Sequence, residues 1–501
     1  MIEKQNFTGK VKEIFVKFDE FFKQPNPSKD ENILNAKKCV ETYNFITESG
    51  SLKNGYGLVD LQMNYQDATY NIAPSVTETR TEIDDIWYYS WAEADTDTVQ
   101  DYIFTYTNDN NINYTELHYP QYVIPMEEPY TSHPEVIKIK QNNREKFLMS
   151  SDNEVYMLAL GLETKLTDSP KVIDACYHFD KLFAIAKGKR NELIYSADDD
   201  VTKWTEDNVT RIDFFDGRGK LLKILNFNDN LYIFREFGIT KIDAYSVNSV
   251  FGISHMYQST SYIFPKTIKV CGGKIYFMTT SGMYAFNGSS VEKIDLEIID
   301  KIDKSLTSQI VTEGYKEKYF IACRMDFKNG TIGCENEAYV NNCILIYDVN
   351  TNDIQVMRGF DVKKFAAINS LNFNKLCAAF RGSHKAQIGE FTEGGVVFGT
   401  PIEKAWSSPL SDGGYPNKLK HIRAFYIKAK QDCKVRVETE LETQEYSVSG
   451  AESIQRVKTN VKGTKFKITI TSTSANEQCI SDVKLSMAVY LWYFSKPHRD
   501  M

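Results

Sequence analysis

Clusters of acidic residues are the first places where this chain could do chemistry. Residues 348–353 put Asp, Asn and Asn at the first, third and fifth positions of a calcium loop. The sixth position of such a loop requires Gly and the twelfth a bidentate Glu, but Asp353 and Gly359 stand there. Because the segment lies between two apolar runs, it predicts a hairpin turn. The acidic run at 198–200 likewise indicates a solvated turn.

Hydrolytic chemistry would need paired carboxylates or an activated nucleophile. Carboxylates that meet at the centre of a ring of sheets could make a glycosidase, but none of the 67 Asp and Glu residues is singled out as a pair. The chain has no Gly-rich phosphate loop, G-x-S-x-G or H-E-x-x-H motif, and its seven His are scattered. The nine Cys form no C-x-x-C pair. The sequence therefore predicts no enzyme, no metal site and no cofactor, with a glycosidase as the enzymatic alternative.

Short β-hairpins recur through the middle of the chain. The clearest runs from Lys274 to Thr279, turns at Ser281-Gly282, returns from Met283 to Phe286 and turns again at Asn287-Gly288. Similar hairpins occupy residues 146–158, 181–197, 230–243, 318–349 and 375–391.

The spacing of these hairpins indicates one architecture above others. Their starts lie roughly 35 to 57 residues apart, which is typical of propeller blades. A blade buries its faces only against neighbouring blades, so the copies imply a closed ring. The sequence predicts an all-β protein with a β-propeller of about six or seven blades over residues 59–398, in which an N-terminal strand pairs into the last blade. A large sandwich or a β-helix is the alternative.

The two ends of the chain differ from the repeats. Residues 1–58 are predicted to form a short N-terminal helical arm and a lead-in segment, because apolar side chains follow helical spacing. These side chains are Val11, Ile14, Phe15, Phe18, Phe21 and Phe22. The arm is expected either to pack on its own domain or to pack on a neighbouring subunit. Residues 399–416 are rich in Pro, Gly and Ser and predict a linker, and residues 417–501 alternate polar and apolar side chains, which predicts a C-terminal antiparallel β-sandwich-like domain.

Glycines in the lead-in segment allow sharp turns that deliver the chain to its first sheet. Gly50, Gly55 and Gly57 are the candidates for this role. Together with Ala36, Asn44 and Leu52 they follow the spacing Ala…Asn…Gly-x-Leu-x-x-Gly-x-Gly. This segment resembles the start of bacteriophage tail proteins that contain a β-propeller, the tail hub, nozzle and packaged-DNA-stabilising type. The run Trp406-Ser-Ser-Pro-Leu410 and the strand that follows it resemble their C-terminal β-sandwich.

The resemblance implies a virion structural protein of a bacteriophage tail that forms a ring around the DNA channel as a hub, nozzle or adaptor. Its expected partners are copies of itself and other tail or connector proteins, and DNA would pass without specific binding. Expected localisation is the virion tail, after synthesis in the host bacterial cytoplasm. A carbohydrate- or receptor-binding propeller module is the main alternative.

Charge and hydropathy fit these expectations. The net charge of −8 disfavours bulk attraction to nucleic acid. Residues 401–501 carry a balance of +5, so the rest of the chain carries −13. The N-terminus lacks the apolar core of a signal peptide, and no apolar run is long enough to span a bilayer. We therefore expect no membrane span.

Overall fold

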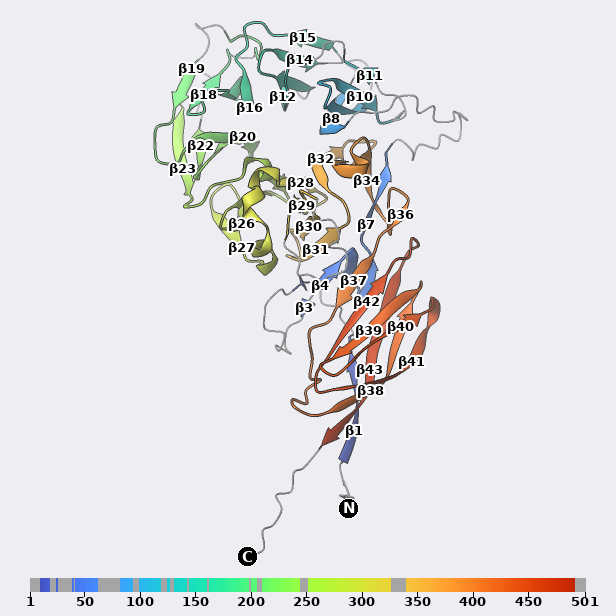
Figure 1. The fold of residues 1–501 in the computed structure, drawn as a ribbon. Coiled ribbons are helices and arrows are strands. Elements are labelled where there is room, and N and C mark those ends of the chain that lie inside the picture. The colour runs from blue at the N-terminus through green and yellow to red at the C-terminus, as the bar shows by residue number, and fades with distance from the viewer. Residues whose placement is uncertain are drawn as a thin grey trace, which may run out of the picture.

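The computed structural model describes residues 10–18, 24–25, 38–39, 41–61, 82–92, 99–118, 124–126, 130–141, 144–159, 162–197, 200–204, 210–243, 251–325 and 339–491. These residues are almost entirely β-strand (Figure 1). The helical residues among them form four short 3-10 helices: η1 (Pro265–Thr267), η2 (Glu297–Lys301), η3 (Lys304–Gln309) and η4 (Gly382–His384). The all-β class expected from the sequence is confirmed.

Seven antiparallel sheets follow one another along the chain and surround a common centre (Figure 1). The first contains β8 (Ile83–Ala92), β9 (Val99–Thr107), β10 (Ile112–Glu116) and β11 (Ile124–Pro125). The second contains β12 (Glu135–Gln141), β13 (Arg144–Ser150), β14 (Val155–Ala159) and β15 (Leu162–Lys165). The third contains β16 (Val172–His178), β17 (Lys181–Ala186), β18 (Glu192–Tyr195) and β19 (Thr210–Asp213).

The remaining four sheets complete the ring. The fourth contains β20 (Leu221–Phe227), β21 (Asn230–Arg235), β22 (Gly238–Asp243) and β23 (Gly252–Gln258). The fifth contains β24 (Lys269–Cys271), β25 (Lys274–Thr279), β26 (Gly282–Phe286) and β27 (Val291–Ile294). The sixth contains β28 (Val311–Tyr315), β29 (Lys318–Cys323), β30 (Cys343–Asp348) and β31 (Ile354–Arg358). The seventh contains β32 (Val362–Asn369), β33 (Asn374–Phe380), β34 (Ile388–Glu393), β35 (Val396–Val397), β36 (Thr400–Pro401) and the N-terminal strand β7 (Tyr56–Asp60).

Strand β7 closes the ring. It pairs antiparallel with β34, from Gly389 opposite Asp60 to Glu393 opposite Tyr56. It also has one parallel partner in β35, where Val397 lies opposite Leu58. A strand from the start of the chain thus completes the last sheet, as the sequence predicts. Pairing of this kind covers an edge that would otherwise present free backbone groups.

The middle strands of most sheets are largely buried on both faces, which explains their continuous apolar sequences. In β17 and β25, for example, nearly every side chain is buried, because each sheet packs on a neighbour on either side. Aromatic rings fill the space between the fourth and fifth sheets, where Phe234 meets Phe277 edge to face at 5.4 Å. The hairpins recognised in the sequence are these middle pairs of strands. The turn at residues 348–353 joins β30 to β31, as expected.

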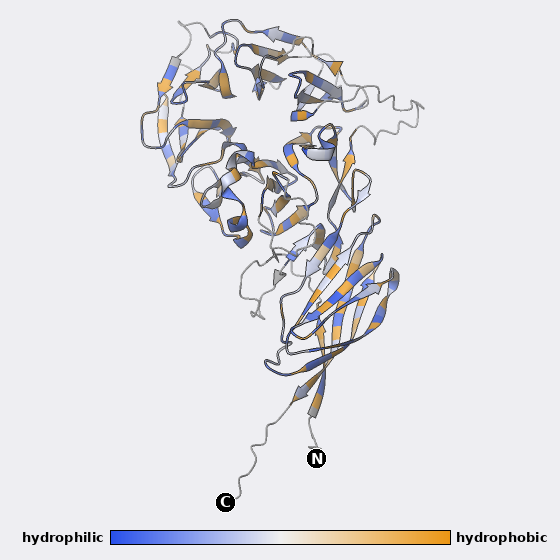
Figure 2. Ribbon diagram, viewed as in Figure 1, coloured by the Kyte–Doolittle hydropathy of each residue, from blue (hydrophilic) through white to orange (hydrophobic). Residues whose placement is uncertain are grey.

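Two further sheets form a sandwich beside the ring (Figure 1). One contains β41 (Ala451–Gly463), β38 (Lys420–Ala429), β43 (Cys479–Leu491), β6 (Ser51–Asn54), β5 (Phe45–Glu48) and β1 (Lys10–Lys17). The other contains β4 (Glu41–Tyr43), β37 (Lys404–Ser407), β42 (Phe466–Ser472), β39 (Cys433–Thr439) and β40 (Thr443–Val448). Polar and apolar residues alternate along these strands (Figure 2), and the apolar set forms a core around Trp406 and Phe425. Two short strands, β2 (Gln24–Pro25) and β3 (Lys38–Cys39), pair in parallel.

The predicted N-terminal helix is wrong. Residues 10–17 form strand β1, which pairs antiparallel with β43 along its whole length, with Ile14 opposite Met487. The apolar residues also fit a period of two, in which Ile14, Val16 and Phe18 share one face. These three pack against the sandwich core, so burial against β43 selects the strand.

The predicted boundaries at the linker are also wrong. Residues 404–407 lie within the expected linker at 399–416, yet they form β37, which pairs with β4 and β42. Lys404 and Trp406 on this strand are both fully buried. The sandwich therefore consists of residues from both ends of the chain, and among the described strands before residue 61 β7 is the one that pairs into the ring.

Candidate functional site

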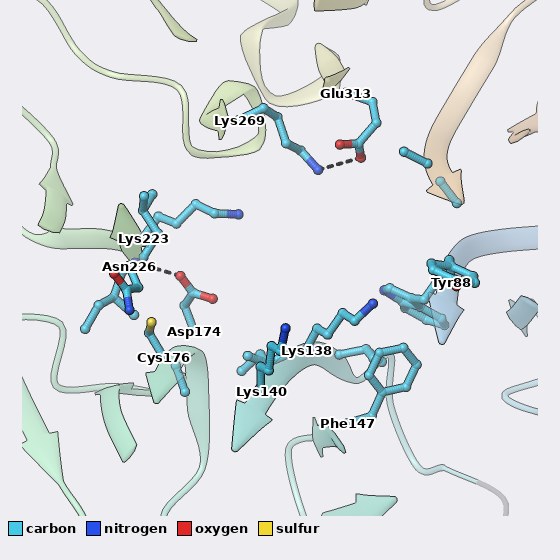
Figure 3. A pocket seen from close by; sticks show the side chains of 18 of the residues that line it. Tyr88, Lys138, Lys140, Phe147, Asp174, Cys176, Lys223, Asn226, Lys269 and Glu313 are labelled. Carbon is cyan, nitrogen blue, oxygen red and sulfur yellow. Dashed lines mark hydrogen bonds and ion pairs between the residues drawn. The ribbon is translucent and has the colours of Figure 1, made fainter. Parts of the chain in front are cut away.

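The first strand of each sheet faces the centre of the ring and lines a cavity there. The larger part of this cavity has a volume of about 1260 Å³ and the smaller part about 610 Å³. Asp174, Lys223, Lys269 and Lys364 line both parts, so the two meet at this level. Figure 3 shows the larger part, with the labelled side chains of several strands pointing toward one open space. We take this cavity as the candidate functional site.

Each of the seven inner strands brings a charged side chain to the cavity. The residues, in chain order, are Asp85, Glu135, Asp174, Lys223, Lys269, Glu313 and Lys364. In β8, β16, β20 and β32 this residue directly follows a break in the pairing register. A β-bulge of this kind turns a side chain toward a new direction and is common beside functional sites. We call these seven residues the axial charge ring.

Two ion pairs join neighbouring sheets within the axial charge ring. Lys269 pairs with Glu313 at 2.7 Å, and Lys364 pairs with Asp85 at 3.0 Å. The second pair links the last sheet to the first. Because Asp85 is buried and the other three are half-buried, the pairing offsets part of the cost of removing each charge from water. These four side chains therefore have partners within the fold, where they link neighbouring sheets.

Asp174 and Lys223 are different, because no ion pair joins these two described residues. Asp174 accepts a hydrogen bond from the backbone N–H of Ile224 at 2.7 Å. Burial nevertheless raises the pKa of Asp174 to about 6, against a weaker opposing effect of Lys223. Burial lowers the pKa of Lys223; the charge of Asp174 opposes this, and the smaller effects of Lys269 and Lys364 add to the lowering. A carboxyl group that titrates near neutrality in a cavity is a mark of functional sites.

The larger part of the cavity also has aromatic walls. Trp87 and Tyr177 line it and are half-buried. Tyr88 lies there too, with the Lys138 ammonium 4.8 Å from its ring centre (Figure 3). Lys138 also pairs with Glu145 at 2.6 Å. The cavity thus combines ring faces with charged groups.

The predicted assembly residues are divided between the core and the surface. Phe18 is buried with its ring edge-on to Trp406 at 6.0 Å, and Ile14 packs on the same core. Val11 is 46% exposed and Phe15 is 59% exposed, so both lie on the outer face of β1. The other two predicted residues, Phe21 and Phe22, lie outside the described residues.

The three predicted turn glycines each meet a backbone requirement. Gly50 has φ of +72°, which favours glycine. A Cβ at Gly55 would lie 2.9 Å from the carbonyl oxygen of Asn44, and one at Gly57 would lie 2.5 Å from that of Val396. Gly55 and Gly57 therefore allow close approach of two backbones.

Asn44, named above for its place in the sequence pattern, joins the ring to the sandwich. It is 4% exposed, and its side chain accepts from Arg358 N–H at 2.8 Å and donates to the carbonyl oxygens of Arg358 at 3.2 Å and Glu403 at 2.7 Å. The guanidinium of Arg358 pairs with Glu41 at 3.0 Å and lies 4.5 Å from the ring centre of Tyr43. We call Glu41, Tyr43, Asn44 and Arg358 the joint.

Sequence reasoning missed the axial charge ring and the joint. The sequence does contain a signal for the axial charge ring, because a charged residue interrupts the apolar strand before several hairpins. Examples are Val172-Ile-Asp174 and Leu221-Leu-Lys223. The partners in the joint lie more than 300 residues apart, and spacing alone gives no signal for them.

Comparison with known proteins identifies no family. No family model matches the chain, and no curated protein matches it. Among solved structures, the extracellular domain of a putative one-component system from B. thetaiotaomicron has 10% identity and a TM-score of 0.39 over 67% of this chain. BBS1N in complex with ARL6DN has 8% identity and a TM-score of 0.39, with 67% of this chain and 96% of that chain covered. The chain spans only 39% of the first of these structures. The ring of seven sheets and the sandwich described above are derived from strand pairing and not from these comparisons.

The described residues lack a membrane-spanning helix and a metal-binding cluster. No helix there is long and apolar enough to cross a membrane. No group of three or more His, Cys, Asp or Glu side chains there is placed to hold a metal ion.

Proposed function

We propose that the chain is a structural protein of a bacteriophage tail, which assembles with copies of itself into a ring around the DNA channel. Its role is mechanical: contacts between subunits, and with other tail or connector proteins, hold the conduit. DNA passes without specific binding. The protein is made in the host bacterial cytoplasm and resides in the virion tail. The resemblance of the lead-in segment and the C-terminal strands to tail propeller proteins gives the class.

The joint is the observation that carries this proposal. A rigid connection between its parts suits a protein whose role is mechanical. Here the segment from Glu41 to Asp60 contributes strands to both sandwich sheets and to the ring, with the buried Asn44 between them. The ring and the sandwich are therefore connected by paired strands and buried hydrogen bonds.

The outer face of β1 is the proposed contact between copies. Among the described strands β1 pairs on one side only, with β43, so its other edge is open. Its exposed Phe15 lies beside Tyr426, with ring centres 6.4 Å apart. An open strand edge beside exposed apolar residues is suited to docking by another chain. In a cyclic assembly this patch would meet a different patch on the next copy. Residues 401–501 carry a charge balance of +5 and the rest of the chain carries −13, so the ring of sheets in the next copy is the complementary surface.

The assembly role is tested by removing apolar area without removing β1. We expect the double substitution Val11→Ser and Phe15→Ser to shift the protein toward monomer, as measured by light scattering over a range of concentrations. Leu371→Ser is the matched control, since Leu371 is 90% exposed on a turn of the ring and outside the patch. Circular dichroism checks that each variant is folded. A wild-type protein that stays monomeric with its tail partners present would contradict the proposal.

The non-catalytic character is tested separately. Asp174, with its raised pKa, is the group that a glycosidase would use as general acid. We expect no hydrolysis when the protein is screened on a panel of glycans. Turnover that Asp174→Asn abolishes would overturn the structural assignment.

A further inference from the structure

Two lysines line the larger part of the cavity without a hydrogen bond or ion pair to any described residue: Lys140 is exposed, and Lys223 is half-buried with Asp174 as the nearby charge that attracts it. Among the described residues, neither Lys140 nor Lys223 has a hydrogen-bond or ion-pair partner, whereas Lys138, Lys269 and Lys364 each pair with a carboxylate. Figure 3 shows both side chains directed into the same open space from different strands. The two ammonium groups are thus available to a ligand.

Lys223 is held in a place that disfavours its charge. It is half-buried, and the nearby ammonium groups of Lys269 and Lys364 oppose its charge, while the carboxylate of Asp174 favours it only in part. An unpaired, partly buried ammonium costs free energy unless a negative group accompanies it. Methionine or leucine would fill the same space without this cost. A negatively charged ligand group would add to the attraction of Asp174 and accounts for a lysine at this position.

The rest of the wall indicates what else the ligand carries. Asp174 and the amide of Asn226 supply further hydrogen-bonding capacity on neighbouring strands, beside the backbone N–H bond that Asp174 accepts and the 3.0 Å contact of Asn226 Nδ2 with His178 Nδ1. Trp87 and Tyr177 supply half-buried ring faces. Hydroxyl groups bind carboxylates and amides, and the C–H face of a sugar ring packs on an aromatic face. A volume of about 1260 Å³ accommodates more than one sugar ring.

We propose that the larger part of the axial cavity binds an acidic saccharide, with a sugar carboxylate against Lys140 and Lys223 and sugar hydroxyls against Asp174 and Asn226. The site lies wholly within the ring of seven sheets and uses none of the residues of β1. It is therefore independent of the assembly role.

The test compares acidic saccharides with their own neutral forms. Calorimetric titration would use short oligogalacturonate, oligoglucuronate and sialyllactose, each paired with the same compound after reduction of its carboxylates to alcohols. We expect at least one acidic form to bind with a defined stoichiometry, about ten-fold or more tightly than its reduced form, because the reduced form leaves the lysines unpaired. Lys223→Met should remove this preference while retaining binding of the neutral form. Lys458→Met is the matched control, on the exposed strand β41 far from the cavity in sequence and fold.

The other outcomes each decide the question. Lys140→Met should weaken the acidic preference in the same direction, which keeps the test valid if Lys223→Met fails to fold by circular dichroism. No binding by any acidic saccharide, or equal binding of acidic and reduced forms, would overturn the proposal. Displacement of the saccharide by sulfate or by a short DNA oligonucleotide at equal concentration would assign the site to a general anion instead. An effect of Lys458→Met equal to that of Lys223→Met would also overturn it.

Discussion

At the scale of the residue, Asp174 makes stability depend on pH. Its pKa is about 6 in the folded protein against an ordinary value of 3.8, and burial is the main cause. The folded state therefore binds this proton more tightly than the unfolded chain does. This contribution to the free energy of unfolding is fully present below pH 3.8, the ordinary pKa, and is lost as the pH rises through about 6.

Asp174→Asn mimics the protonated form and should reverse this loss. We expect it to raise the free energy of unfolding by about 1 to 3 kcal/mol near pH 8, and to have little effect near pH 4. Urea denaturation at both pH values measures the difference. Asp229→Asn, at the rim of the same cavity, is the matched control. A gain that is the same at both pH values would show that the charge is not its cause.

Single residues were only partly predictable from sequence. The turn at residues 348–353 could be predicted because its Asp and Asn residues suit a tight turn in any fold. Asp174 and Lys223 could not be brought together from sequence, because their meeting depends on the order of sheets around a common centre. The same holds for Asn44 and Arg358, whose hydrogen bonds join distant parts of the chain.

At the scale of the element, β1 offers a direct test of strand against helix. In a helix Phe15 and Phe18 would lie on one face, whereas in β1 they differ, since Phe18 is 7% exposed and Phe15 is 59% exposed. We expect Phe18→Ala to lower the free energy of unfolding by about 3 kcal/mol, and Phe15→Ala to lower it by less than about 1 kcal/mol. Chemical denaturation of the two variants measures this. Equal losses would contradict the assignment of the strand.

Elements were predictable where local pattern and burial agree. The middle hairpins stand out because both faces are buried and a tight turn follows, as in β25 and β26. The inner strands carry charges toward the cavity, so their sequences lack a continuous apolar pattern. Strand β1 was mistaken for a helix because its apolar residues fit both periods, and its partner β43 is made of residues 479–491 at the other end of the chain.

At the scale of the whole molecule, the joint should make the ring and the sandwich unfold together. Asn44→Ala removes three hydrogen bonds, two to Arg358 and one to Glu403, and places Ala at a φ of +57° that Asn tolerates better. We expect a loss of about 3 kcal/mol or more in the free energy of unfolding, and two calorimetric transitions in place of one.

Asn460→Ala is the matched control for the joint, because Asn460 is exposed on β41. It should retain a single transition and a nearly unchanged melting temperature. A single transition in Asn44→Ala, at the temperature of the control, would show that the two parts are coupled elsewhere.

The closing strand β7 also fixes when this protein can finish folding during its synthesis. Asp60 pairs with Gly389, so roughly 330 residues must be translated between the two partners. At about 5 to 20 residues per second, β7 leaves the ribosome about 15 to 70 s before β34 exists. The middle sheets have local partners and can form in that interval, while closure of the ring waits for a contact of very long sequence separation, which is a slow kind of step. A chain interrupted before residue 388 keeps an open ring with unpaired edges, and so remains exposed to chaperones and proteases instead of joining an assembly.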